Sequence, residues 1–201
     1  TSCQALCPSG FLKVEPPVLL RSGWLASRSA AMRSISAWIA AGSPGEEPLP
    51  TSGEVARQLQ VWEQFLNGGS RKEQLMSRYL YEHLFLGHLH FEADATHRAF
   101  RLVRSSTPPG QPQQIIATRR PYDDPGVERV WYRLEPEREV ILAKTHMPYG
   151  LSPARMAKYR GWFLGSEVRV SALPSYAAEV ASNPFETFRK LPVDSRYRFL
   201  L

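Results

Sequence analysis

The chain has 201 residues, of which 43% are hydrophobic, and a formal net charge of +6. This length suits one domain, or one domain with part of a second, and the apolar share is large enough for a real core, so we expect a globular protein. The sequence has no run of 18 apolar residues and no charged-then-apolar leader, so it predicts no membrane-spanning helix and no export signal. Seventeen prolines and thirteen glycines favour an α+β fold over a helix bundle.

The first part of the chain predicts one helix and a linker. Residues 1–24 have no steady period, whereas apolar residues recur at helical spacing from Leu25 until Gly42, where the helix should end. The proline-rich residues 46–53 then predict a boundary between an N-terminal fragment, residues 1–45, and a main domain.

Two helices should follow the linker. Apolar residues from Glu54 to Leu66 have helical spacing. Ser70 with Glu73 three positions later is the signature of a capping box, which predicts a helix that runs to Gly87.

Strands are predicted next, where the spacing changes to a period of two. An antiparallel arrangement is the simplest pairing for them. The predicted strands are residues 88–92, 100–104, 114–118 and 127–134.

The last third mixes helices with one strand. Pro136 and the acidic residues after it predict a helix toward Lys144, and Ser152 followed by proline predicts another that runs to Leu164. Further elements are expected as a strand over 167–173 and helices over 184–190 and 194–201. The chain stops on the apolar run RYRFLL, so we expect a C-terminally truncated domain over residues 54–201.

Three of the five histidines, His83, His88 and His90, lie in the stretch SRYLYEHLFLGHLHF. On a strand, His88 and His90 would share one face, a spacing that suits metal ligation, although polar core or surface histidines fit the pattern too. No third ligand is evident, so the identity of any metal stays unknown.

His146 and Met147 lie just before a proline and a predicted helix. In this position a thioether could ligate haem iron, and it could equally fill a gap in the core.

Arginine supplies most of the 25 basic residues. Arg101, Arg104, Arg119 and Arg120, together with Tyr122, could form a face that binds phosphate or carboxylate, or a solvated strand face. A genome rich in G and C would also explain the arginine content.

Other motifs are incomplete or missing. Cys3 and Cys7 could form a disulfide, remain free thiols or be half of a larger site. The sequence has no P-loop, no dinucleotide-binding glycine pattern and no nucleophile elbow, which disfavours nucleotide and hydrolase chemistry.

Several long blocks resemble the bacterial fatty acid cis/trans isomerase family. The resemblance covers roughly residues 54–201. The segment Met32 to Pro44, ending AWIAAGSP, also resembles the last helix of a cytochrome c-like unit that precedes this region in the family. The blocks are SRYLYEHLFLGHLHFE, FRLVRSSTPPGQP, IATRRPYDDPGVERVWYRL, ILAKTHMPYGLSPARMAKYR and ALPSYAAEVASNPFETF.

The resemblance implies a periplasmic haem c enzyme that converts cis double bonds of unsaturated membrane fatty acids to trans. Haem would withdraw electron density from the double bond and so permit rotation about it. The implied partners are a membrane phospholipid or a free fatty acid, reached by peripheral contact with the membrane, and no nucleic acid. The alternative is a noncatalytic docking or electron-transfer region of a haem c protein.

This chain departs from the pattern of the family in one respect. The C-x-x-C-H motif that attaches haem is absent, so this sequence should hold no covalent haem and should be inactive in isolation.

Candidate residues can be named for each role. His83, His88 and His90 are the candidate catalytic residues, and His146 and Met147 the candidate haem ligands. An enzyme that reaches acyl chains needs an apolar groove with a basic rim. The candidates for contacts with the substrate and its headgroup are Arg119, Arg120, Tyr122 and Trp131.

Overall fold

The structure is a computed structural model that describes residues 32–42, 52–96, 98–137 and 147–200. The chain separates into two compact units, Thr1–Glu46 and Glu47–Leu201. In the first unit, residues 32–40 are helical, as the apolar spacing predicted, and the start of the predicted helix lies outside the described residues. The predicted boundaries at residues 45 and 53 stay a prediction.

The second unit begins with two helices whose ends are set by serine caps. Helix α2 spans Gly53–Leu66, and the side chain of Ser52 accepts a hydrogen bond from the backbone at its start. Helix α3 spans Arg71–Leu84, and the predicted capping box between Ser70 and Glu73 is formed in both directions.

A four-stranded sheet follows, in the order β3-β2-β1-β4. The strands are β1 (His88–Phe91), β2 (Phe100–Ser105), β3 (Trp131–Pro136) and β4 (Pro148–Leu151). Strand β2 pairs antiparallel with both neighbours, whereas β4 runs parallel to β1 along its whole length. The α+β class is therefore confirmed, but the sheet is mixed rather than antiparallel. The partner of β1 comes from a segment almost 60 residues later, which local spacing does not reveal.

Two predicted strands are wrong. Residues 114–118 form only an isolated bridge between Ser105 and Ile115. Residues 167–173 form no strand, because no strand of the described sheet pairs with them. Arg71 donates to the carbonyl of Ser171, and Lys72 donates to that of Ser166.

The remaining elements are helical. Helix α4 (Pro153–Tyr159) continues directly into η1, a π-helical segment over Arg160–Leu164, so the predicted helix from Ser152 to Leu164 is confirmed in position. Three short helices close the domain: α5 (Ala178–Ala181), α6 (Pro184–Thr187) and α7 (Val193–Leu200). The predicted helix from Pro136 to Lys144 lies almost entirely outside the described residues, and Pro136 itself ends β3.

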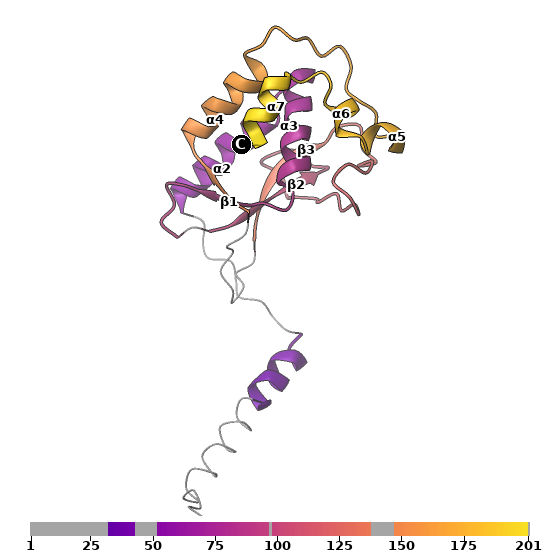
Figure 1. Cartoon of the computed structure of the whole chain (residues 1–201). Coiled ribbons are helices and arrows are strands. Elements are labelled where there is room, and N and C mark those ends of the chain that lie inside the picture. Colours follow the sequence, from indigo (N-terminus) through magenta and orange to yellow (C-terminus); the bar gives the residue numbers. More distant parts are fainter. Residues whose placement is uncertain (1–31, 43–51, 97, 138–146, 201) are drawn as a thin grey trace, which may run out of the picture. The chain divides into compact units, whose positions relative to one another are not determined.

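The core lies between the sheet and the helices above it in Figure 1. Alternate residues of β1 face inward, so Leu89 and Phe91 are buried whereas the histidines between them are only partly buried. The ring of Tyr79 is central to the helical side, with the Phe188 ring at 4.9 Å and the Phe163 ring at 5.4 Å between centroids. Aromatic packing of this kind holds the C-terminal helices against α3.

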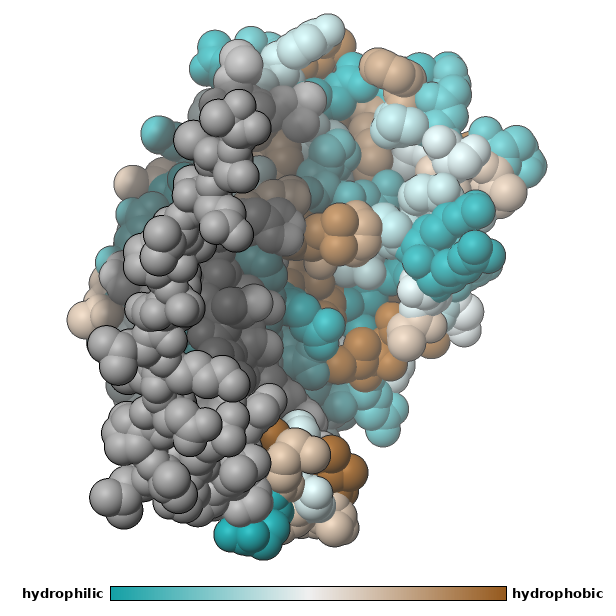
Figure 2. Space-filling model, turned by 60° about the horizontal axis from the view of Figure 1, so that its bottom comes forward, coloured by the Kyte–Doolittle hydropathy of each residue, from teal (hydrophilic) through white to brown (hydrophobic). Residues whose placement is uncertain are grey.

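The surface combines apolar and polar side chains. On the face in Figure 2, hydrophobic residues of the described part form small separate groups among hydrophilic ones. Among the described helices, none is long and apolar enough to cross a bilayer.

Strand β3 is an edge strand, and helix α2 covers its outer backbone groups. The Asn67 side chain accepts from the amide of Tyr132 and donates to its carbonyl, both at 2.8 Å. One turn earlier on α2, the carboxylate of Glu63 accepts from the amide of Leu134 at 3.0 Å and from Nε of Arg133 at 3.0 Å. These bonds anchor α2 to the sheet and shield an edge that would otherwise be open for pairing.

Glu63→Ala should lower the free energy of unfolding by about 3 kcal/mol, because it leaves the largely buried Arg133 guanidinium without its carboxylate. Urea denaturation measures this loss. The matched control is Glu186→Ala, which removes an exposed ion pair with Arg189 and should change stability by no more than about 0.5 kcal/mol. Equal losses in the two variants would contradict the anchoring role of Glu63.

Candidate functional site

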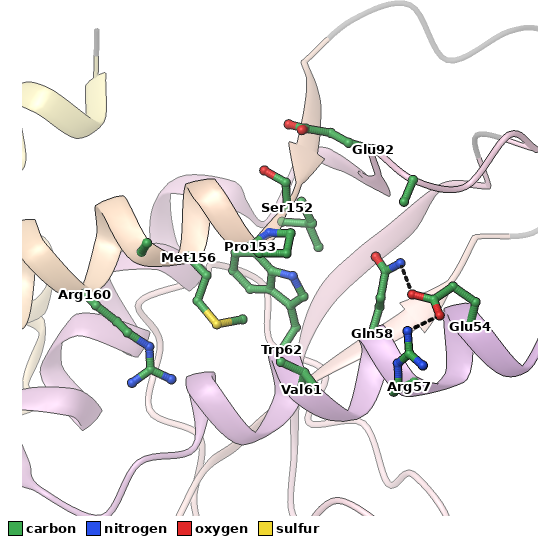
Figure 3. A pocket seen from close by; sticks show the side chains of 13 residues that line it. Glu54, Arg57, Gln58, Val61, Trp62, Glu92, Ser152, Pro153, Met156 and Arg160 are labelled. Atoms are coloured by element: carbon green, nitrogen blue, oxygen red, sulfur yellow. Dashed lines mark hydrogen bonds and ion pairs between the residues drawn. The ribbon is translucent and has the colours of Figure 1, made fainter.

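The described residues of the second unit enclose a groove between helices α2 and α4, which we call the α2–α4 groove (Figure 3). Its volume is about 670 Å³, within the range of ligand pockets. It is lined by Glu54, Arg57, Gln58, Val61, Trp62, Glu92, Ala93, Leu151, Ser152, Pro153, Met156, Ala157 and Arg160.

The walls of the groove are apolar because two helices each turn an apolar edge toward it. Trp62 is held on edge against the ring of Phe65, at 5.7 Å between centroids, and is 4% exposed. Met156 faces it from α4 and is also buried, whereas Val61 is half exposed. The walls are therefore rigid at the indole and adaptable at the thioether.

The order of the elements places α4 at this point. Strand β4 ends at Leu151, and Ser152 caps α4 by accepting from the amide of Arg155 at 3.3 Å. Pro153 occupies the first turn, where its missing amide proton is not needed. Because β4 pairs with β1, the chain enters α4 beside the end of β1, which brings Glu92 to the same rim.

Charged groups lie at the rim. Arg57 is paired with Glu54, and Gln58 donates to the same carboxylate at 2.8 Å. The hydrogen bond from Gln58, with the Arg57 guanidinium, lowers the pKa of Glu54 below its usual value. The Arg160 guanidinium lies 4.9 Å from the centre of the Phe65 ring. A molecule with a long apolar part fits these walls, with its polar end at the rim.

His83 belongs to the aromatic core rather than to the groove. Its ring stacks on Tyr79 at 4.0 Å between centroids, and Nδ1 lies 2.8 Å from the Tyr79 carbonyl. Burial lowers the pKa of His83, and the hydrogen bond to the carbonyl opposes this effect only partly. The imidazole is therefore held neutral, with its Nδ1 proton directed to the backbone.

His88 and His90 lie on the outer face of β1, away from the core. Nδ1 of His88 is 2.7 Å from a carboxylate oxygen of Glu137. The hollow beside His88 has a volume of about 440 Å³ and includes the paired side chains of Arg101 and Glu135. Within the described ranges no group of three histidine, cysteine or acidic side chains could hold a metal ion. The catalytic assignment of the three histidines stays a prediction.

The predicted haem ligands are only partly described. His146 lies outside the described residues. Met147 precedes β4, is 39% exposed and has a φ of 50°, which is uncommon for a residue other than glycine. Its carbonyl accepts from the amide of His88 at 2.9 Å, so its backbone helps to align β4 with β1.

The arginines that could share an anion-binding face are separated. Arg101 and Arg104 are three residues apart on β2 and so point to opposite faces of the sheet. Arg104 is 1% exposed and donates to the carbonyl of Asp123 at 2.9 Å, so it holds a loop in place. The prediction that Arg101 and Arg104 share one anion-binding face is therefore wrong.

The candidate headgroup residues lie around that loop. Arg119 and Arg120 are exposed, and the Arg120 guanidinium is 5.8 Å from the centre of the Tyr122 ring. Trp131 begins β3, with the Arg129 guanidinium 4.9 Å from its ring. None of the four candidates lines the α2–α4 groove, and their contact with a headgroup stays a prediction.

Sequence reasoning did not identify the groove. Trp62 and Met156 have the spacing of ordinary core residues, and the two helices that meet are about 100 residues apart. The one available signal was an amphipathic helix, α2, whose apolar residue Val61 stays half exposed. That signal does not indicate which other part of the chain forms the second wall of the groove.

The model of the fatty acid cis/trans isomerase (CTI) family matches residues 24–201 of this chain. The chain belongs to the fatty acid cis/trans isomerase family. Searches of curated proteins and of solved structures gave no match. Membership of the isomerase family implies an isomerase that acts on a fatty acid or lipid, and the apolar groove suits such a substrate.

The haem c that was expected from the isomerase family does not fit the described residues. Covalent attachment needs C-x-x-C-H, which the sequence lacks. The hollow beside His88 is lined by Arg101, Glu135 and Glu137 as well as by Phe85, Leu86 and Pro136, so it presents charges where a porphyrin needs an apolar slot. Neither the sequence motif nor this hollow therefore fits a haem c within the described residues.

His83→Phe should flatten the pH dependence of stability. Since the folded pKa of His83 lies below its unfolded value of 6.5, its contribution is complete above pH 6.5 and is lost as the pH falls through the folded pKa. Urea unfolding at pH 7.5 and pH 5.5 should show a smaller decrease for the variant than for the wild type. An NMR titration of the His83 ring at or above pH 6.5 would argue against the buried neutral form.

Proposed function

We propose that this chain is the acyl-binding region of an isomerase that converts cis double bonds of unsaturated membrane fatty acids to trans. The observation that carries the proposal is the α2–α4 groove, an apolar hollow of about 670 Å³ in a chain of the fatty acid cis/trans isomerase family.

Burial of the acyl chain supplies the binding energy. Each methylene removed from water contributes about 0.8 kcal/mol. Eight methylenes in contact with Trp62, Met156 and Leu151 would therefore contribute about 6 kcal/mol before the costs of association.

The walls suit both the substrate and the product. A cis double bond bends the acyl chain, whereas a trans bond leaves it nearly straight, so the site must accept two shapes. Trp62 is packed rigidly and can position the chain, while Met156 has three rotatable bonds and can adjust to either shape. These residues orient the chain and exclude water from it.

The other parts of the proposal come from the family resemblance. They are a haem c carried outside this sequence, rotation about a double bond that this haem weakens, a cytochrome c-like origin of residues 1–45, a periplasmic location and peripheral contact with the membrane. In this arrangement the described residues hold the acyl chain while the haem lies in another part of the protein.

Ala157→Trp should block the groove, because Ala157 is exposed on α4 and lines the cavity, so an indole there would occupy it. We expect at least about a tenfold loss of affinity for oleate, equivalent to about 1.4 kcal/mol. Displacement of a fluorescent fatty acid measures this affinity. The matched control, Ala178→Trp, places the same side chain at an exposed site on α5 outside the groove.

The same pair of variants, introduced into the full-length protein that carries the haem c, tests the activity in cells. Gas chromatography should show a lower trans-to-cis ratio of membrane fatty acids with Ala157→Trp than with Ala178→Trp. An unchanged ratio in the blocked variant would refute the role of the groove. A wild-type protein with a haem spectrum and no lipid conversion would favour the electron-transfer alternative.

A further inference from the structure

A second hollow lies next to the α2–α4 groove, between α4, η1 and α7, and we call it the Arg155 hollow. Its volume is about 450 Å³. It shares Glu92 and Ser152 with the groove, so the two cavities meet at the start of α4. It is lined by Glu92, Tyr149, Ser152, Ala154, Arg155, Lys158, Tyr159, Trp162, Arg198 and Phe199.

The Arg155 hollow is rich in cations. Arg155 and Lys158 are three residues apart on α4 and so lie on the same side of the helix, and Arg198 faces the hollow from α7. Glu92 is the single carboxylate among the residues that line it, so the hollow is positive overall. Arg198 is also paired with Asp194, at 2.8 Å, but both side chains are more than half exposed, which makes this pair weak.

One of these cations has unused hydrogen-bonding capacity. Nε of Arg155 is buried and has no hydrogen-bond partner among the described residues. A buried N–H group without a partner is costly, although the Arg155 side chain also has a hydrogen bond to Tyr159. An oxyanion is the ligand that guanidinium groups bind best. Burial raises the pKa of the neighbouring Tyr159, with the Arg155 guanidinium opposing it, so this phenol stays neutral and able to donate a proton to a ligand oxygen.

The geometry points to a phosphate-binding site: we propose that the Arg155 hollow takes the phosphate group of a glycerophospholipid whose acyl chain lies in the α2–α4 groove. The acyl half of this inference rests on the proposed function. Arginine and lysine would bind the phosphate oxygens, and the boundary at Ser152 and Glu92 would lie near the uncharged ester linkage.

The outer surface of α7 supports a membrane source for the phosphate. Val193 and Tyr197 are one helical turn apart and are 57% and 66% exposed. They lie on the same short helix as Arg198. Exposed aliphatic and tyrosine side chains beside cations are typical of surfaces that enter the interface of an anionic bilayer. A soluble phosphate ester would not need this apolar neighbour.

The test compares two double variants of equal charge. Lys158→Met with Arg198→Met removes two cations from the hollow, whereas Arg33→Met with Arg169→Met removes two exposed cations elsewhere. The assay is sedimentation of the whole chain with vesicles of phosphatidylethanolamine and phosphatidylglycerol at physiological ionic strength. We expect about tenfold weaker binding for the first pair and about twofold for the second. Circular dichroism of both variants confirms that they fold.

Each outcome of the test is decisive. Equal weakening by the two pairs would mean diffuse charge attraction and overturn the site. Release of the chain from the vesicles by millimolar glycerol 3-phosphate would assign the hollow to soluble phosphate esters instead. If Ala157→Trp abolishes oleate binding but the two pairs behave alike, the groove stands and the phosphate site fails. If Ala157→Trp leaves oleate binding intact while the first pair weakens vesicle binding selectively, the phosphate site stands without the groove.

Discussion

The arrangement of the second unit depends on Glu63 of α2 and on Asn67, the residue that caps the C-terminal end of α2. Both side chains bind the outer backbone of the edge strand β3. Strand β3 has a neighbour on one side only, so its outward amides and carbonyls need partners. A helix that supplies them from two positions one turn apart is fixed in both distance and rotation. The ion pair with Arg133 adds a charge-assisted bond at the same place.

This attachment of α2 to β3 determines which side of α2 remains available to line a cavity. With Glu63 and Asn67 turned to the sheet, the neighbouring positions Val61 and Trp62 face α4 and form one wall of the α2–α4 groove. The other wall is fixed independently, since β4 leads directly into the serine-capped α4. The groove is thus a consequence of where two helices are anchored, and its apolar wall of Trp62, Met156 and Leu151 also belongs to the core.

Two cavities of different character meet where β4 ends and α4 begins. One is lined mainly by apolar side chains and the other by arginine, lysine and tyrosine, a division that matches a molecule with an acyl chain and an anionic headgroup. Gly150 allows this crowded junction, because a Cβ atom there would lie 2.6 Å from a carboxylate oxygen of Glu92. The histidines, by contrast, are divided between the core and the outer face of the sheet.

The sequence by itself determined the elements whose signals are local. The capping box at Ser70, the serine cap at Ser152 and the helical spacing of apolar residues placed α2, α3 and α4, because these signals act within one or two turns. The same sequence also carried the family blocks. The alternation at residues 167–173 was misleading, since a strand needs a partner and the local pattern does not say whether one is present.

Only the tertiary structure decided the parallel pairing of β4, the edge contacts of α2 and the two cavities. Each of these joins segments between about 60 and 110 residues apart, and no local spacing encodes which segments meet. The candidate residues show the same limit. His83, Arg104 and Trp62 are residue types found both in functional sites and in cores. Only the folded chain shows that His83 stacks on Tyr79 in the aromatic core, that Arg104 holds a loop and that Trp62 lies at the wall of the groove.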